Sequence, residues 1–271
     1  MIDILFINCN RLPYTKLALP ALLADPTEEF SLTIWDNGST DGTREYLAST
    51  DDPRISRKVF SEENVRIHGA VNDVVRKSSA DLFGIVFDDD RVTPGWTRPL
   101  AQAHADVPEF GMIGCWHFSP DTFDYQRAKH KIQKFAQHQV LRHPWTGVGA
   151  GLVKLKSLRE CGPLESSRTT PYWIRMAQKG YVNGFYFPLI YVEHMDYPWS
   201  QHFAFSDKLD EWFETSSGPK RLGIRSVEEA KAWHQVIVRN VFDDPWDPKY
   251  YVGWWGRLRT VRERMRKILR T

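Results

Sequence analysis

Three adjacent aspartates, Asp88-Asp89-Asp90, directly follow the most apolar stretch of the sequence, Leu82 to Phe87. Neighbouring carboxylates repel one another, which raises their pKa values unless a cation neutralises them. Mg²⁺ and Mn²⁺ prefer carboxylate oxygens and often bind through one or two of them, leaving positions for phosphate oxygens. An acidic turn before Pro94 is the alternative, because aspartate is common in turns. The preceding apolar strand and two further polar segments favour a divalent-metal site.

The second polar segment runs from Asp36 to Thr43 and follows an apolar run at 31–35. A carboxylate at a strand end can accept hydrogen bonds from a base N–H or a ribose hydroxyl. Gly38 and Ser39 allow close approach of the backbone at the start of a helix, where anions are favoured. A simple turn with a helix N-cap would use the same residues, and both interpretations can hold together.

The order of elements places these polar segments at one edge of a sheet. Apolar runs at 4–7 and 82–87 predict strands, segments 31–35 and 55–60 are strand-like, and helices are predicted between them at 13–24, 40–47 and 65–77. Such alternation predicts a parallel sheet with helices on both faces. Ligands of these sheets bind beyond the carboxyl ends of the strands. We therefore expect Asn8–Arg11, Asp36–Asp41 and Asp88–Asp90 to lie side by side.

Beyond Asp90 the pattern is weaker. It predicts strands at 112–118 and 147–153, a helix at 171–180 and a strand-like segment at 185–192. The polar segment 119–144 has little periodicity, which suits either a mobile lid or acceptor loop, or an exposed helix.

Composition excludes several classes of protein. The 271 residues include 42% hydrophobic residues, enough for one large α/β domain or a domain with an appendage. A net charge of +2 gives no reason to expect nucleic acid as a partner. Cys9, Cys115 and Cys161 are too few and too scattered for a disulfide framework. No run approaches the roughly twenty apolar residues that span a bilayer, so we expect a cytoplasmic protein.

The chain ends in a basic segment. In 254–270, apolar residues recur at helical spacing, and seven arginines and lysines surround a single glutamate, Glu263. A basic amphipathic helix suits an anionic membrane surface, which predicts peripheral contact at the inner face of the membrane. A terminal helix docked on the domain with a solvated basic face is the alternative.

Together these segments resemble the family 2 glycosyltransferases, which have a GT-A fold. The resemblance rests on Asn8-Cys9-Asn10-Arg11, on Asp36 to Thr43, on a segment with Asn64, Gly69 and Asn72, and on the Asp-x-Asp run 88–90. It covers about the first hundred residues in order. Arg66 stands where the family usually has glycine, which could alter phosphate contact.

The resemblance implies a nucleotide-sugar donor, Mn²⁺ or Mg²⁺ as cofactor, and inversion at the anomeric carbon. The residues it places on the nucleotide-sugar are Asn8, Asn10, Arg11, Asp36, Ser39, Asn64, Arg66, Gly69, Asn72, Asp88 and Asp89. Asp88, Asp90 and His194 would ligate the metal, and Asp90 also acts in catalysis. Trp145, Gly147 and Gly149 would lie on the acceptor side.

One departure concerns the catalytic base. Inverting members place a carboxylate just before the helix that matches Arg175 to Gly180, but here Thr169 and Pro171 occupy those positions. An inverting transfer needs a base for the proton of the acceptor hydroxyl. Glu165 is the nearest candidate, and Asp121 and Asp124 are others. A different mechanism or a loss of activity would also explain the departure.

We therefore predict a GT-A-like α/β domain at 1–200, divided into a nucleotide-binding half (1–100) and an acceptor-side half (101–200), followed by an aromatic-rich helical extension at 201–271. The predicted reaction moves a sugar from a nucleoside diphosphate, with uridine favoured because it is common in the family, to a hydroxyl of a glycan, a lipid-linked sugar or another small acceptor. Nucleotidyl transfer is disfavoured because a Gly-rich basic loop does not follow the first strand. The alternative is a degenerate, non-catalytic nucleotide-binding or scaffold protein.

Overall fold

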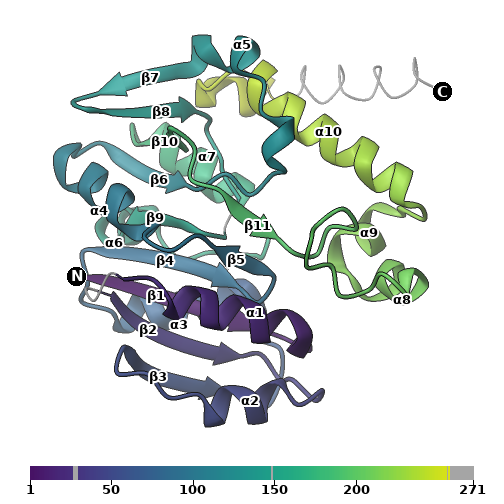
Figure 1. Cartoon of the computed structure of the whole chain (residues 1–271). Helices are drawn as coiled ribbons and strands as arrows, with labels where there is room; N and C mark the ends of the chain where they lie inside the picture. Colours follow the sequence, from purple (N-terminus) through teal and green to yellow (C-terminus); the bar gives the residue numbers. More distant parts are fainter. Residues whose placement is uncertain (27–29, 148, 255, 257–271) are drawn as a thin grey trace.

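A nine-stranded sheet forms the centre of the chain (Figure 1). The computed structural model describes residues 1–26, 30–147, 149–254 and 256. The strands in sheet order are β3 (Ile55–Phe60), β2 (Phe30–Asp36), β1 (Ile2–Asn8), β4 (Leu82–Phe87), β9 (Gly151–Lys154), β6 (Phe110–Gly114), β10 (Val182–Phe187), β8 (His138–Arg142) and β7 (Ile132–Phe135). Among these described strands, only β8 and β9 run against the others. The predicted α/β fold with a mainly parallel central sheet is confirmed.

Helices cover both faces of this sheet. They are α1 (Leu12–Leu23), α2 (Thr43–Ser49), α3 (Arg66–Lys77), α4 (Thr97–Asp106), α5 (Tyr125–Ala128), α6 (Leu155–Cys161) and α7 (Thr170–Gln178), with short 3₁₀ turns η1 (Pro120–Thr122) and η2 (Lys129–Lys131). Strand β1 shows why its sequence is apolar throughout. Ile4 and Phe6 pack into the cluster with α1 and α4, whereas Leu5 and Ile7 pack into the cluster with α3, α6 and α7. A strand covered on both faces has no solvent-facing positions.

A small second sheet leaves the edge of the first. It pairs β5 (Asp90–Val92) with β11 (Val192–His194) in antiparallel register, so that Asp90 lies opposite His194. The family resemblance predicted a strand at Val192–His194, whereas β5, with only three residues, is too short for the sequence pattern to distinguish it from a turn.

Segment 119–144 corrects the expectation of a lid or an exposed helix. It contains η1, α5 and η2, followed by the antiparallel hairpin β7–β8, and β8 pairs with β10 of the central sheet. The hairpin was hard to recognise because β7 lies at the sheet edge and is only partly buried. Val140 and Leu141 of β8 are fully buried.

The C-terminal region is helical, with α8 (Leu209–Thr215), α9 (Ser217–Leu222), α10 (Val227–Asp243) and η3 (Pro248–Tyr251). These helices lie together on one side of the sheet (Figure 1). Val238, Val241 and Phe242 of α10 pack on Trp116 and Phe185, so the extension shares a core with the sheet.

The predicted basic helix at 254–270 lies outside the described residues, apart from Trp254 and Gly256. Within the described part of the chain, the search for a helix long and apolar enough to cross a membrane found none.

Candidate functional site

Three polar segments meet at the carboxyl ends of β1, β2 and β4, as the alternation of elements predicts. Asn8 is the register partner of Asp36, and Ile7 is that of Phe87, so Asp88 follows directly beside them. The backbone N–H of Cys9 donates to the Asp88 carboxylate at 3.0 Å. Residues distant in sequence therefore form one polar edge, because parallel strands place their ends together.

Asp88 and Asp90 are both buried carboxylates. Asp90 is 2% exposed, and its Oδ2 accepts a hydrogen bond from the N–H of Phe87 at 3.2 Å. Burial, and next the charge of Asp89, raise the pKa of Asp90 to about 7. The same two causes hold the pKa of Asp88 well above its usual range. Arg11 offsets part of this effect at Asp88 and His194 offsets part of it at Asp90, and a bound cation would relieve the rest.

His194 lies across from Asp90 on the paired strands β5 and β11. Its Nδ1 is buried and has no hydrogen-bond partner among the described residues. Gly149 approaches from the other side, since a Cβ at that position would stand 1.9 Å from Asp90 Oδ2. Two carboxylates of raised pKa and an unpaired imidazole nitrogen suit Mn²⁺ or Mg²⁺ in their chemistry. No three such side chains among the described residues converge into a formed metal cluster.

Asp89 belongs to a buried ion-pair network rather than to an open edge. Arg11 Nη1 donates to Asp89 at 2.9 Å, and Arg11 Nη2 donates to Asp196 at 3.0 Å. Asp196 also accepts from Ser216 Oγ at 2.9 Å and from Trp212 Nε1 at 2.9 Å. The network connects the end of β4 to the C-terminal helices. The family resemblance implied that Arg11 contacts the nucleotide-sugar, whereas no sequence motif marked Asp196.

Asp36 is fully buried and already has protein partners. Its carboxylate accepts from Arg44 Nε at 3.0 Å and from the N–H of Ser39 at 3.2 Å. Arg44 extends further to the carbonyl of Ser61. Arg44, which no sequence motif marked, thus holds the Asp36 carboxylate in place at this edge.

Asn10 and Asn8 hold neighbouring backbone in place. The N–H of Asn10 donates to Ser39 Oγ at 2.9 Å, and Asn10 Oδ1 accepts from the N–H of Thr40 at 2.7 Å. Asn8 Oδ1 accepts from Thr15 Oγ1 at 3.0 Å. Asn10 has a φ of 53°, a left-handed conformation that asparagine tolerates better than most residues. These contacts fix the edge on which Asp36 stands.

The third matched segment begins helix α3. Arg66 has a φ of 65°, which explains why glycine suits this position in the family. Asn64 Oδ1 accepts from the N–H of Arg66 at 2.8 Å, which stabilises the turn.

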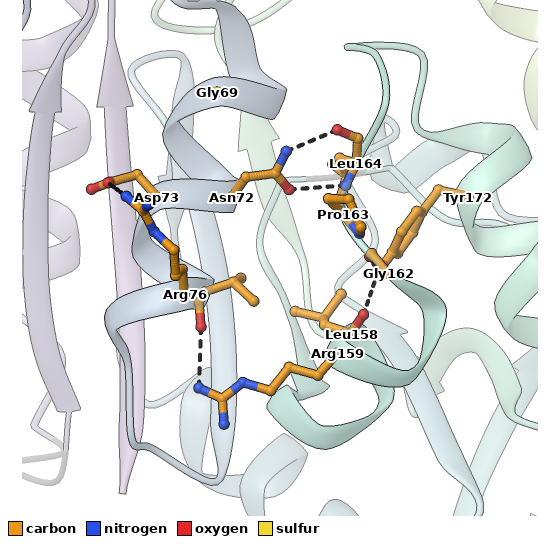
Figure 2. A pocket seen from close by; sticks show the side chains of 11 residues that line it. Gly69, Asn72, Asp73, Arg76, Leu158, Arg159, Gly162, Pro163, Leu164 and Tyr172 are labelled. Atoms are coloured by element: carbon orange, nitrogen blue, oxygen red, sulfur yellow. Dashed lines mark hydrogen bonds and ion pairs between the residues drawn. The ribbon is translucent and has the colours of Figure 1, made fainter.

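Gly69 and Asn72 of α3 line a groove of about 550 Å³ between α3 and α6 (Figure 2). The amide of Asn72 exchanges two hydrogen bonds with the backbone of Leu164, at 2.8 and 2.9 Å. Both ends of this amide are thus used within the protein. Asn72 thus joins α3 to the loop before α7 through two hydrogen bonds.

The predicted acceptor-side residues lie in two different surroundings: Gly149 lies beside Asp90, whereas Trp145 and Gly147 lie beside histidines. Trp145 is half-buried and packs edge-on against His143, and a Cβ on Gly147 would stand 2.6 Å from His117 Cε1. The side chain of Glu165 is 78% exposed, and its Oε1 accepts a hydrogen bond from Arg175 Nη1 at 3.1 Å. Thr169 stands at the N-terminus of α7 without a side-chain cap.

The profile of the family described as Glycosyl transferase family 2 matches residues 3–155, and the chain belongs to this family. A validoxylamine A glucosyltransferase of Streptomyces hygroscopicus subsp. jinggangensis (strain 5008) is 24% identical over 153 residues, 54% of this chain and 36% of that protein. Its counterpart from subsp. limoneus is 26% identical over 124 residues, 44% of this chain and 27% of that protein. The chain thus spans about a third of the length of these relatives.

Solved structures share the fold. The mannosyltransferase PcManGT from Pyrobaculum calidifontis, in complex with GDP-Man and Mn²⁺, has a TM-score of 0.57 at 16% identity, covering 89% of this chain and 81% of its own. S. aureus TarS 1–349 in complex with UDP-GlcNAc has a TM-score of 0.50 at 13% identity, covering 89% and 82%. The fold is that of the GT-A glycosyltransferases.

Proposed function

We propose that this chain transfers a sugar from a nucleoside-diphosphate donor, with a UDP-sugar favoured, to a hydroxyl of a glycan, a lipid-linked sugar or another small acceptor. The observation that carries the proposal is the buried pair Asp88 and Asp90, at the strand edge beside Asp36 and opposite His194. The family and the GT-A fold support the class of reaction. The donors bound by PcManGT and TarS support a nucleotide-sugar.

The proposed roles follow the position of each residue. Asp36, held by Arg44, takes the nucleoside, and the neighbouring Asn10 and Ser39 shape its edge. Asp88, Asp90 and His194 would hold Mn²⁺ or Mg²⁺. When bound, the metal offsets the charge that builds on the diphosphate as the sugar leaves.

The reaction forms a bond between the acceptor oxygen and the anomeric carbon and breaks the bond from that carbon to the diphosphate. The diphosphate keeps the electron pair, and a base takes the proton of the acceptor hydroxyl. We propose inversion as the outcome. Glu165 is tied to Arg175 at the surface, whereas Asp121 lines a cavity that His194 also lines, so the geometry supports Asp121 better as the base.

A second candidate is a non-catalytic nucleotide-binding or scaffold protein. The observation that favours it is the start of α7, where Thr169 and Pro171 stand in place of the carboxylates usual in inverting members. Nucleotide binding without turnover would support this candidate.

Calorimetric titration of UDP, GDP, dTDP and CDP, with Mn²⁺ and with a chelator, tests the donor site. We expect one nucleotide to bind selectively and to need the metal. At about pH 8, where Asp90 is ionised, Asp90→Asn should weaken this binding at least about tenfold, or about 1.4 kcal/mol. Asp51→Asn, at an exposed position, is the control. Equal binding by the Asp90 variant would overturn the metal assignment, and binding of no nucleotide would overturn the transferase proposal.

We also propose that a cytoplasmic location is combined with peripheral membrane contact through 254–270. The support is the sequence pattern of that segment. Sedimentation with anionic liposomes, with and without 254–271, tests it. Equal sedimentation of the two proteins would remove the proposal.

A further inference from the structure

A cavity of about 870 Å³ is lined in part by His194, the residue paired with Asp90. Its walls come from the end of α1, from β5 and β11, from residues 117–122, and from α10 of the C-terminal region. We call it the aromatic cavity, after its lining residues His117, Tyr197, Trp199 and His234, which lie beside Lys231 and Gln235. Its volume is within the range of sites for small molecules.

Three rings are stacked along this cavity. His194 stacks on Tyr197 at 4.4 Å between centroids, and Tyr197 stacks on Trp199 at 4.9 Å with only 10° between the planes. Trp199 Nε1 donates to Ser119 Oγ at 2.9 Å, which fixes the indole. Helix α10 contributes a fourth ring, His234, which packs edge-on against Tyr197 and Trp199. The stack begins at the residue that faces Asp90 and ends at Trp199, which is half-buried.

One residue that lines the cavity, His234, has a ring nitrogen without a hydrogen-bond partner among the described residues. His234 is 2% exposed, and its Nε2 is buried with no hydrogen-bond partner among the described residues. A buried polar group without a partner costs stability, and a ligand in the cavity that reached this nitrogen would supply the partner. A hydroxyl group can do so either as donor or as acceptor.

The charges around the cavity are balanced. Arg91 and Glu193 lie 3.7 Å apart on the paired strands β5 and β11. Lys231 and Asp121, both exposed, add one charge of each sign. A polyanion would find no net attraction here. The flat rings suit a ligand with an apolar face, because C–H groups are attracted to the negative face of an aromatic ring.

We propose that the aromatic cavity is the acceptor subsite and that it takes a neutral sugar ring, stacked on Trp199 and hydrogen-bonded to His234. This inference rests on the proposed function, and it adds that the C-terminal helix α10 takes part in choosing the acceptor. The sugar would lie next to His194, and so next to Asp90, where the transfer would occur.

Saturation-transfer NMR on the full chain tests this, with the methyl glycopyranosides of glucose, galactose, mannose and N-acetylglucosamine as probes. We expect saturation of the ring protons of at least one glycoside. Gln235→Trp, from an exposed position of α10, should fill the cavity and weaken glycoside binding at least about tenfold. Val236→Trp is the matched control, because Val236 is 39% exposed on the same helix and does not line the cavity.

A second pair of variants removes the stacking ring. Trp199→Ala should weaken glycoside binding to a similar extent, and Trp254→Ala, at a 68% exposed tryptophan, should not. If Trp199→Ala does not fold, Gln235→Trp decides. Absence of binding by all four glycosides, or unchanged binding by Gln235→Trp, would overturn the inference.

Titration of the nucleotides on the same proteins separates this inference from the proposed function. Nucleotide binding without glycoside binding would overturn the assignment of the aromatic cavity as acceptor subsite, but not the proposed donor site. Glycoside binding that depends on Trp199, without nucleotide binding, would support the sugar site and overturn the donor proposal.

Discussion

Asp196 is the residue on which the buried network around the polar edge depends most. It is 8% exposed and accepts hydrogen bonds from Arg11 at 3.0 Å, Tyr14 at 3.3 Å, Trp212 at 2.9 Å and Ser216 at 2.9 Å. Asp196→Asn keeps the shape of the side chain but removes its charge and replaces one acceptor oxygen by a donor. Some of these four donors would then face an N–H group instead of an oxygen.

The size of the effect follows from burial. Removing one partner of a buried ion pair costs about 3–5 kcal/mol. The Arg11 side chain is 18% exposed and keeps its contact with Asp89, so we expect the lower end, about 3 kcal/mol. A domain of this size loses roughly 2–4 °C in Tm per kcal/mol, which predicts a loss of about 6–12 °C.

Thermal unfolding followed by circular dichroism measures this loss. Asp210→Asn, at an exposed position on α8, is the control and should shift Tm by less than about 2 °C. A double-mutant cycle with Ser216→Ala should give a coupling of about 0.5–3 kcal/mol, since the two side chains share hydrogen bonds. A shift for Asp196→Asn as small as that of the control would refute the argument that the network stabilises the fold.

Two further predictions concern single positions. Gly149→Ala should abolish metal-dependent nucleotide binding in titration, because its Cβ would stand 1.9 Å from Asp90 Oδ2. Gly218→Ala, where the added Cβ meets open space, is the control and should bind the nucleotide normally. Normal binding by both variants would contradict the close packing of Gly149 on Asp90. Burial lowers the pKa of His104 to about 3, so below about pH 6.5 the unfolded chain binds a proton that the folded chain does not, and stability falls as the pH falls toward 3. We therefore expect that, in urea unfolding between pH 4 and 7, His104→Gln reduces the loss of unfolding free energy on acidification by up to about 1.4 kcal/mol per pH unit. His130→Gln is the control for loss of an exposed imidazole. If the unfolding free energy of His104→Gln depends on pH as steeply as that of the unchanged protein, the burial of His104 does not have this effect.

The sequence alone was sufficient to predict the first four strands of the sheet and the edge at which polar residues meet. Apolar runs of strand length, alternating with helical segments, predicted β1, β2, β3 and β4 and the convergence of their polar ends. This is possible because such signals are local: β1 and β4 are buried on both faces and are almost entirely apolar, whereas β3 at the sheet edge is only partly buried. Arg66 is a related case, since the departure from glycine was visible in the sequence and its left-handed φ in the structure.

Weak local signals account for the elements that were misjudged. Strand β7 lies at the sheet edge with little burial, and β5 has only three residues. Their pairing is decided by partners elsewhere in the chain, so no window of sequence around them contains the information.

The partners of the charged side chains were decided only by the tertiary structure. Sequence motifs marked Arg11 and Asp36, but could not show that Arg11 reaches Asp196, 185 positions away, or that Arg44 holds Asp36. The aromatic cavity likewise combines His194 with His234 of a separate helix. Sequence by itself determined which edge of the sheet carries the polar groups, because the alternation of strands and helices implies parallel strands whose carboxyl ends lie at one edge. Which of those groups are already satisfied within the protein depends on contacts between distant segments, and only folding brings these together.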